Sequence, residues 1–256
     1  MAQTHNCIVV IPAHNEEASI ARVIGSIPRD GLPGWRVSVL VVNDGSSDGT
    51  SEAAREAGAE YIYSSAVNCG LGAAVRFGLK QAYRLGADAA VMIDADNEYP
   101  AAEIPAVMGP ILAGDADYVI GSRFMRKVEG MKAYRRIGNR LFTWLQSALL
   151  RTRLHDGQSG MRAFNRAALR DLRIIHDYNY AQVMTLSLVR QRYRLREVPI
   201  SYRVRETGES FIRWNYAFKV APAIVKELMK PAGGSQPHDP APYRIEEPSA
   251  LGAASE

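Results

Sequence analysis

Cysteine is scarce in this chain: the 256 residues include only Cys7 and Cys69. Neither lies at a metal-ligand spacing from a second cysteine or from a group of histidines, so the sequence supports neither a disulfide framework nor a zinc site. We therefore expect a reducing, cytoplasmic environment. Long apolar runs are also absent, since no segment approaches the roughly 18 apolar residues that a membrane span needs. The polar residues 1–6 do not resemble a signal peptide, and we expect a chain that does not cross the membrane.

Acidic residues are scarce in the second half of the chain. Residues 1–119 carry 7 Lys and Arg against 15 Asp and Glu, a net charge of −8. Residues 120–230 carry 23 against 8, a net charge of +15. An acidic half joined to a basic half predicts a cation site followed by a surface for anionic ligands. The alternative is a basic face that is simply solvated.

Short apolar runs rich in β-branched residues alternate with segments of helical periodicity. This alternation predicts βαβ units and an α/β fold, with a Rossmann-like, mostly parallel sheet flanked by helices. The length favours a single domain over residues 1–230, followed by a disordered tail over residues 231–256, which are rich in Pro, Gly, Ser and Ala. Strands are predicted at 7–12, 37–42, 61–64, 89–93, 118–120, 161–163 and 196–203, and helices at 13–27, 50–57, 71–85, 137–150, 180–192 and 211–230.

Two carboxylates, Asp94 and Asp96, follow the predicted strand 89–93 directly. They would repel each other unless a divalent cation compensates, and oxygen ligands of this kind suit Mg²⁺ or Mn²⁺. Because side chains alternate along extended backbone, we expect Asp94, Asp96 and Glu98 to project to the same side as metal ligands. An Asp-x-Asp pair is common by chance, so the prediction depends on its position at the end of a buried strand.

Polar loops follow four of the predicted strands, at 14–17, 43–48, 68–72 and 94–98. Ligands of parallel sheets collect at the carboxyl ends of the strands, so we expect one site there. Asp44 can accept a hydrogen bond from a ring N–H of a base, and the small loop containing Asn68, Gly70 and Gly72 lets backbone approach a ligand. For each loop alone, turn formation and helix capping remain the alternative.

Six motifs occur in a fixed order: I-V-V-I-P-A-H-N-E, V-V-N-D-G-S-S-D-G-T, N-C-G-L-G-A-A, D-A-D, G-S-R-F and D-G-Q-S-G-M-R-A-F. Over residues 6–215 the chain resembles an inverting family-2 glycosyltransferase of GT-A fold, in the branch of the dolichyl- or polyprenyl-phosphate mannose and glucose synthases. The resemblance implies metal-dependent transfer, with inversion, from a UDP- or GDP-sugar to a polyprenyl phosphate. It implies a nucleotide-binding half over 1–119 and an acceptor-binding half over 120–230.

The resemblance also assigns roles to individual residues. Base and ribose contacts fall on Pro12, His14, Glu16 and Asp44, and the metal and diphosphate positions on Asp94, Asp96 and Glu98. Ser122 and Arg123 match the G-S-R segment, and Arg135 and Asn139 match the anion-binding segment that follows it. Arg205 and Ser210 match the late R-x-x-G-x-S motif, whose arginine faces the phosphates in this family, and Ser159 is a substrate-binding position in the D-G-Q-S-G motif. Departures from the family pattern, such as His14 for a common Tyr and Asn43 for a common acidic residue, leave the base, sugar and acceptor open.

The acceptor decides whether a general base is needed. A phosphate is already anionic near neutral pH, whereas a hydroxyl acceptor requires a base, for which Asp156 stands at the right place in the motif order. The alternative for Asp156 is a loop residue that caps the following turn. Arg123, Arg135 and Arg205 would supply forked donors to phosphate oxygens.

Two basic segments with aromatic residues, 131–150 and 211–230, suit peripheral contact with the cytoplasmic face of a membrane. Packing of their aromatics onto the sheet is the alternative. Three other functions compete: transfer to a soluble hydroxyl acceptor, a nucleic-acid-binding module that uses the basic half, and a catalytically silent scaffold. The acidic first half and the lack of a nucleic-acid motif argue against the second, and the intact Asp-Ala-Asp argues against the third. The sequence does not specify an oligomeric state.

Overall fold

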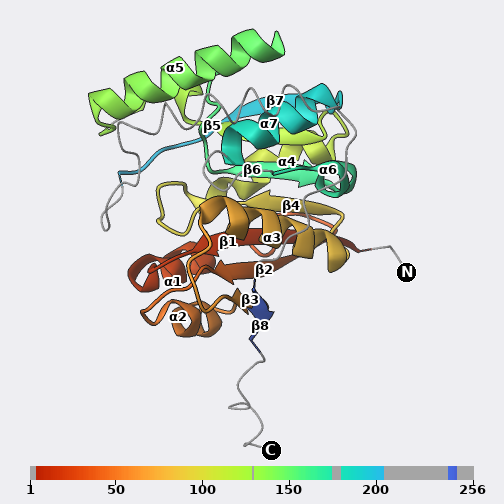
Figure 1. Cartoon of the computed structure of the whole chain (residues 1–256). Helices are drawn as coiled ribbons and strands as arrows, with labels where there is room; N and C mark the ends of the chain where they lie inside the picture. The colour runs from red at the N-terminus through yellow and green to blue at the C-terminus, as the bar shows by residue number, and fades with distance from the viewer. Residues whose placement is uncertain (1–3, 129, 175–179, 205–241, 247–256) are drawn as a thin grey trace, which may run out of the picture.

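The computed structural model describes residues 4–128, 130–174, 180–204 and 242–246. Their strands form one eight-stranded sheet in the order β7-β5-β6-β4-β1-β2-β3-β8 (Figure 1). The strands are β1 (His5–Ala13), β2 (Trp35–Asn43), β3 (Tyr61–Ser64), β4 (Ala89–Met92), β5 (Tyr118–Ser122), β6 (Arg162–Asn165), β7 (Leu195–Pro199) and β8 (Arg244–Ile245).

The centre of the sheet is parallel, as the sequence predicts. β1 pairs in parallel with β2 and with β4, β2 pairs in parallel with β3, and β5 with β7. Two strands run the other way: β6 is antiparallel to both β4 and β5, and β8 is antiparallel to β3. The mostly parallel α/β sheet is therefore confirmed.

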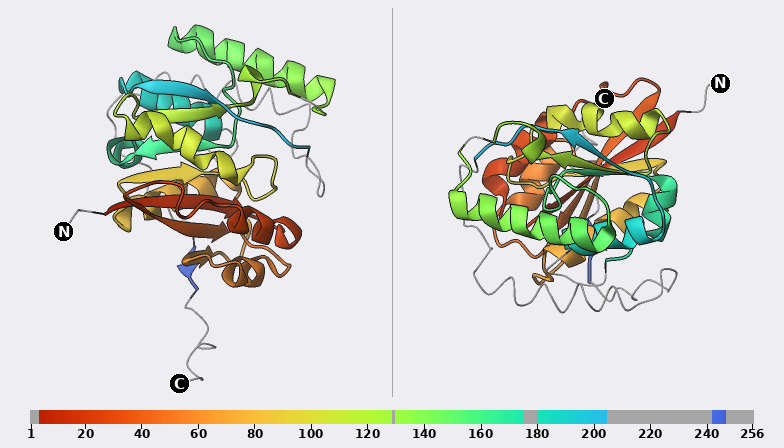
Figure 2. Two further views of the ribbon diagram at one scale, coloured as in Figure 1. Left: turned by 180° about the vertical axis from the view of Figure 1, so that it is seen from behind. Right: turned by 90° about the horizontal axis from the view of Figure 1, so that it is seen from above.

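Helices cover both faces of the sheet (Figure 2). One layer of the core joins the sheet to α1 and α4 through residues such as Ile20 and Val107. The other layer joins it to α3, α6 and α7 through residues such as Leu79 and Met184. Burial of each such side chain stabilises the fold by about 1.5–3 kcal/mol. The helices are α1 (Glu17–Gly25), α2 (Thr50–Glu56), α3 (Leu71–Arg84), α4 (Ile104–Leu112), α5 (Ala133–Leu150), α6 (Arg166–Asp171) and α7 (Tyr180–Arg190).

The sequence misses two helices. α4 contains Pro105, Gly109 and Pro110, which read as breakers, yet Pro105 lies in its first turn, where proline is tolerated. α6 has only six residues, too few for a helical period to show. The predicted helix over 211–230 lies outside the described residues.

The tail predicted to be disordered contains an ordered segment, so the prediction is wrong for residues 242–246. Ile245 pairs with Tyr63 and Arg244 with Ser64, so these residues extend the sheet beyond β3. Backbone pairing with the free edge of β3 provides the order that local sequence does not predict. The rest of 231–256 lies outside the described residues. In the part of the chain that is described, no helix has the length and apolar character needed to cross a membrane.

Candidate functional site

The loops that follow β1 and β2 are fastened to each other at the carboxyl edge of the sheet. Nδ1 of His14 lies 2.9 Å from the backbone oxygen of Asp44, and Asn15 takes a left-handed backbone conformation with φ of 55°. Further hydrogen bonds connect a backbone N–H of one loop to a side-chain oxygen of the other, in both directions. The further bonds join Asn15 N to Ser46 Oγ (2.9 Å), Ser47 N to Asn15 Oδ1 (2.9 Å) and Glu16 N to Thr50 Oγ1 (2.9 Å).

Asp44 also fastens the loop that follows β3. Its Oδ1 accepts from the backbone N–H of Cys69 and its Oδ2 from that of Gly70, both at 2.8 Å. The two loops touch closely, since a Cβ on Gly45 would lie 2.6 Å from the backbone nitrogen of Asn68. Gly45 also has φ of 70°, so only glycine fits without strain. Three of the four predicted polar loops thus meet around Asp44, while Pro12 and Gly72 are buried beneath them.

The fourth loop carries the carboxylates, and it is a turn rather than extended backbone. β4 ends at Met92, and Asn97 has φ of 59°. The alternation expected to project Asp94, Asp96 and Glu98 to one side is therefore the wrong reason for their proximity. Oδ1 of Asp96 accepts from the backbone N–H of Glu98 at 3.0 Å, which holds the turn together.

The carboxylate of Asp94 lies in an environment that disfavours its charged form. Burial raises the pKa of Asp94 well above its usual range, and the charges of Asp96 and Glu98 raise it further. The positive charges of Arg123 and Arg162 lower this pKa, but by less. Within the described ranges, Oδ1 of Asp94 is a buried atom with no hydrogen-bond partner. A hard divalent cation would satisfy that atom and offset the repulsion, so the residues present fit Mg²⁺ or Mn²⁺.

Glu98 does not join Asp94 and Asp96 in a ready-made ligand set. Among the described residues, no three His, Cys, Asp or Glu side chains are grouped to hold a metal ion. Oε1 of Glu98 instead accepts from Nη1 of Arg135 at 3.2 Å, and its side chain is 6% exposed. Asp94 and Asp96 are candidate cation ligands, and Glu98 stays a predicted third ligand that in this structure pairs with Arg135.

The loop before β6 packs directly against the Asp94 side chain. A Cβ on Gly160 would lie 2.6 Å from Cγ of Asp94, so glycine is the residue that lets the carboxylate lie there. The backbone N–H of Gly160 donates to the hydroxyl of Tyr99 at 3.0 Å, and Ser159 beside it is fully buried. The D-G-Q-S-G motif thus shapes the surroundings of the Asp94 carboxylate through its backbone.

Substituting Gly160 by alanine should therefore damage the carboxylate site specifically. We expect the added methyl group to displace Asp94 and to lower metal-dependent turnover by about 10- to 100-fold, because about 1 Å of misplacement near the chemistry can cost 100-fold. Steady-state kinetics across a Mn²⁺ series measure this effect. Gly109→Ala is the matched control, since a Cβ there meets nothing within 4 Å. Equal turnover in the two variants would contradict the assignment.

Asp156 is not available as a general base in this arrangement. It is fully buried, and its two oxygens accept from Nε and Nη2 of Arg123 at 2.6 and 2.8 Å. The backbone N–H groups of Arg123 and Gln158 donate to it as well, at 3.1 and 3.2 Å. Both carboxylate oxygens are therefore already engaged by donors of the protein itself. The geometry favours the structural alternative, in which Asp156 caps its turn and holds Arg123.

The remaining predicted residues lie at different depths. Ser122 and Asn139 are buried, at 0% and 8% exposure, while Arg135 is partly exposed beside Glu98. Arg205 and Ser210 lie outside the described residues. Just before them in the chain, the backbone N–H of Arg203 donates to the carbonyl of Glu98 at 2.9 Å.

Sequence reasoning missed two residues that organise the site. Arg162 is fully buried and donates to the backbone oxygens of Ser159 (2.8 Å) and Gly157 (2.9 Å), so it shapes the loop against Asp94. Glu197 accepts from the backbone N–H groups of His155 and Asp156, both at 2.8 Å. An arginine within the otherwise apolar predicted strand 161–163 is a signal that could have identified Arg162. Glu197 has no comparable signal.

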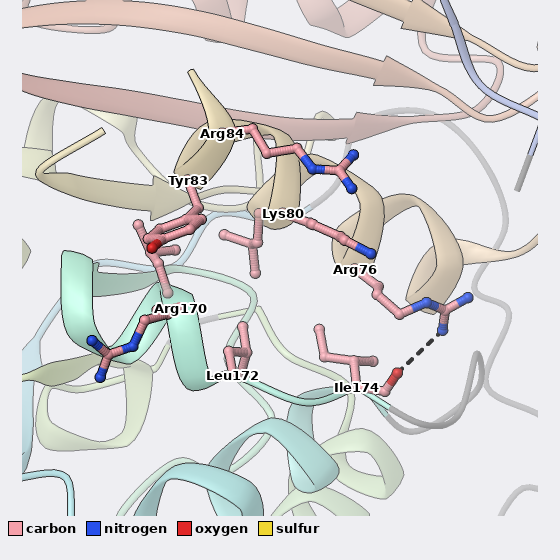
Figure 3. Close-up of a pocket in the computed structure, with 9 residues that line it drawn as sticks. Arg76, Lys80, Tyr83, Arg84, Arg170, Leu172 and Ile174 are labelled. Atoms are coloured by element: carbon pink, nitrogen blue, oxygen red, sulfur yellow. Dashed lines mark hydrogen bonds between the residues drawn. The ribbon is translucent and has the colours of Figure 1, made fainter. Parts of the chain in front are cut away.

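A separate pocket of about 210 Å³ lies along α3, against Leu172 and Ile174 (Figure 3). Its floor is apolar, and Arg76 donates to the backbone oxygen of Ile174 at 3.3 Å. None of the residues that the motifs predict lines it. The candidate site is therefore the loop cluster at the carboxyl edge of the sheet. The pocket is lined by Arg76, Leu79, Lys80, Tyr83, Arg84, Leu169, Arg170, Leu172 and Ile174.

A mostly parallel α/β sheet whose polar loops gather at the carboxyl ends of its strands, with an Asp-x-Asp turn among them, is the arrangement expected of a GT-A sugar transferase. The chain belongs to glycosyl transferase family 2, whose model matches residues 8–173. It is 34% identical over 222 residues to a dolichyl-phosphate hexose transferase of Haloferax volcanii, covering 87% of this chain and 92% of that one. It is 32% identical to an undecaprenyl-phosphate mannosyltransferase of Micrococcus luteus, covering 79% and 86% of the two chains. The chain is a glycosyltransferase.

The solved structures agree on the fold. Glucosyl-3-phosphoglycerate synthase from Mycobacterium tuberculosis, crystallised with Mn²⁺, UDP and glucosyl-3-phosphoglycerate, superposes with a TM-score of 0.71 at 24% identity. The match covers 89% of this chain and 81% of that one. The GT-A fold predicted from the motifs is confirmed.

Proposed function

We propose that the protein transfers a sugar, with inversion, from a UDP- or GDP-sugar to a polyprenyl phosphate at a membrane surface. The observation that carries this proposal is the position of α5. Its residue Arg135 contacts Glu98 in the site at 3.2 Å, while other faces of the same helix are exposed. The helix lies at the end of the molecule beyond β5 and β7 (Figure 1).

The exposed face of α5 carries an apolar stripe. Tyr134, Ile137, Leu141 and Trp144 follow one another at intervals of three and four residues and are 55–67% exposed. Exposed Lys132 and Arg140 flank the stripe. A helix with this pattern suits the boundary between headgroups and acyl chains. With α5 at this boundary, the isoprenoid tail of the acceptor would lie in the lipid while its phosphate reaches the candidate site. The alternative from the sequence was that these aromatics pack onto the sheet. Trp144 does not, since it is 67% exposed.

The names of the relatives support the same acceptor. The Haloferax and Micrococcus enzymes are named for dolichyl and undecaprenyl phosphate, and a relative in Mycolicibacterium smegmatis, 30% identical over 81% of each chain, is a polyprenol monophosphomannose synthase. Two free cysteines, one buried and one partly exposed, fit the reducing cytoplasmic side of the membrane. We place the enzyme there.

In the proposed reaction, an oxygen of the acceptor phosphate forms a bond to the anomeric carbon as the bond from that carbon to the nucleoside diphosphate breaks. Asp94 and Asp96 would hold a divalent cation, which supplies Lewis-acid stabilisation of the leaving diphosphate. The Asp44 carboxylate accepts a hydrogen bond from a ring N–H of the base. The backbone of residues 68–70 lies against the nucleotide. The acceptor phosphate is already anionic, so the reaction needs no general base. The pairing of Asp156 with Arg123 is therefore compatible with the proposed reaction.

The proposal is tested by radiolabelled donors in the presence of Mn²⁺, with undecaprenyl phosphate in detergent or a soluble hydroxyl acceptor such as a free hexose. Extraction into organic solvent separates lipid-linked sugar from soluble products. We expect label in the organic phase with at least one UDP- or GDP-sugar. Transfer to the soluble acceptor alone, with the organic phase unlabelled across the donor panel, would overturn the lipid-phosphate acceptor.

The α5 stripe yields a separate prediction. Replacing Leu141 and Trp144 together by Asp should lower binding to anionic vesicles at least about 10-fold, since each buried large apolar side chain contributes about 1.5–3 kcal/mol. Cosedimentation with phosphatidylglycerol vesicles measures the effect. Leu112→Asp is the control, because Leu112 is 41% exposed but lies at the end of α4. Equal loss in both variants would argue against α5 as the membrane-facing helix.

A further inference from the structure

The segment 242–246 is attached to the donor side of the site from nearly 200 residues away in sequence. The hydroxyl of Tyr243 donates to Oδ1 of Asp44 at 2.6 Å. β8 runs antiparallel to β3, and Arg244 is paired with Ser64, the last residue of β3. Tyr243 therefore lies at the same carboxyl edge of the sheet as the loops that surround Asp44.

Tyr243 is built into the core rather than laid over the site. It is 8% exposed, and its ring centroid lies 4.6 Å from that of Phe77 on α3. Burial raises the pKa of its phenol, and the bond to Asp44 raises it further, so the hydroxyl remains a donor throughout the physiological range. The Tyr243 side chain is therefore part of the folded core, and we expect it to stay in place when a ligand binds.

The rest of the segment is anchored by a second carboxylate. Glu246 accepts from the hydroxyls of Ser51 (2.8 Å) and Ser64 and pairs with Nη2 of Arg55 at 2.5 Å. Ser51 in turn accepts from Nδ2 of Asn43, the neighbour of Asp44, at 2.7 Å. The anchor therefore holds Tyr243 in register with the end of β2.

The bonds to Asp44 leave it little freedom. Two backbone N–H groups and the phenol already occupy three of the roughly four acceptor positions of the carboxylate. About one acceptor position is then left for a further donor, such as a single ring N–H of a base. Without the phenol, Oδ1 keeps only the bond from Cys69.

We propose that Tyr243 is a positioning residue for the nucleotide base, which it serves by orienting the Asp44 carboxylate, and that Glu246 acts through it by docking the segment. This rests on the proposed donor role of Asp44. Because the base is held equally in the ground state and the transition state, loss of the phenol weakens donor binding and leaves the chemical step unchanged.

The test uses the full-length chain with Tyr243→Phe, Glu246→Ala and the double variant. Calorimetry with UDP and GDP in Mn²⁺ measures binding, and donor turnover gives KM and kcat. We expect Tyr243→Phe to weaken the binding of the cognate nucleotide and raise the donor KM by about 10-fold, with kcat within about 2-fold, as for a hydrogen bond to a charged group. Glu246→Ala should act in the same direction, and the double variant should be less than additive because both act through one contact.

Tyr193→Phe is the matched control, since the Tyr193 hydroxyl also donates to an aspartate, Asp171, at 2.5 Å, but away from the site. It should leave nucleotide binding unchanged. If wild-type protein binds a nucleotide and Tyr243→Phe binds it equally well, the inference is wrong while the proposed function stands. If kcat falls with KM unchanged, positioning of the base is also wrong. Wild-type protein that binds neither nucleotide would overturn the proposed function and this inference with it.

Discussion

Asp96→Asn lowers sugar transfer by at least about 100-fold and leaves the chain folded, if the turn after β4 holds the donor's diphosphate through a cation. Removing one preorganised group that stabilises charge in a transition state typically costs about 100- to 1,000-fold in kcat. Asparagine keeps a side-chain oxygen, so it can still accept from the backbone N–H of Glu98, as Asp96 does at 3.0 Å. The substitution therefore removes charge without opening the turn.

Turnover with saturating Mn²⁺ and thermal unfolding of the same preparations measure the two effects. Asp115→Asn is the control, because Asp115 is an exposed loop carboxylate before β5. We expect the control to retain wild-type turnover. Unchanged turnover in Asp96→Asn would show that the carboxylate turn is not the cation site. A large fall in unfolding temperature would instead assign it a role in folding.

Asp156→Ala has the largest effect on stability that the structure predicts. Arg123 is 3% exposed and Asp156 is fully buried, and they are joined by two side-chain hydrogen bonds. Removing the carboxylate leaves a buried guanidinium without its counter-charge, which typically costs about 3–5 kcal/mol. At about 2–4 °C per kcal/mol for a chain of this size, unfolding shifts down by about 10 °C.

Scanning calorimetry or urea unfolding measures this shift. Glu52→Ala is the control, since the Glu52 side chain is 68% exposed and lies 3.8 Å from Arg55, and an exposed pair contributes about 0–1 kcal/mol. Replacing both buried partners, with Arg123→Met and Asp156→Leu, should recover most of the lost stability. A loss in Asp156→Ala no greater than in the control would contradict the account of this pair.

The carboxyl edge of the sheet was predictable because its signals are local. The strand 61–64 and the helix beginning at Leu71 are read from short apolar runs and a preceding glycine, and the polar loops follow those runs directly. Parallel pairing then brings the loops together without any knowledge of side-chain contacts. This reasoning led to Asp44 and Asp94 as neighbours of one site.

What the sequence did not predict depends on contacts between distant residues. Nothing local shows that Asp156 pairs with Arg123 or that Glu98 pairs with Arg135, so the sequence did not predict the ion pairs in which the candidate base and the candidate metal ligand take part. The strand around Tyr243 has only two paired residues in a Pro-rich tail, and it is ordered by β3 and Asp44 rather than by its own periodicity.

The central claim is that the loop cluster around Asp44 and Asp94 binds a nucleotide-sugar together with a divalent cation. Calorimetric titration of the full-length protein with UDP-glucose, UDP-N-acetylglucosamine and GDP-mannose, each with and without Mn²⁺, tests it most directly. The account predicts that at least one donor binds, at least about 10-fold more tightly with Mn²⁺ than without, as metal linkage requires, and that Asp96→Asn abolishes this dependence. Binding of no donor, or equal binding with and without Mn²⁺, would contradict it.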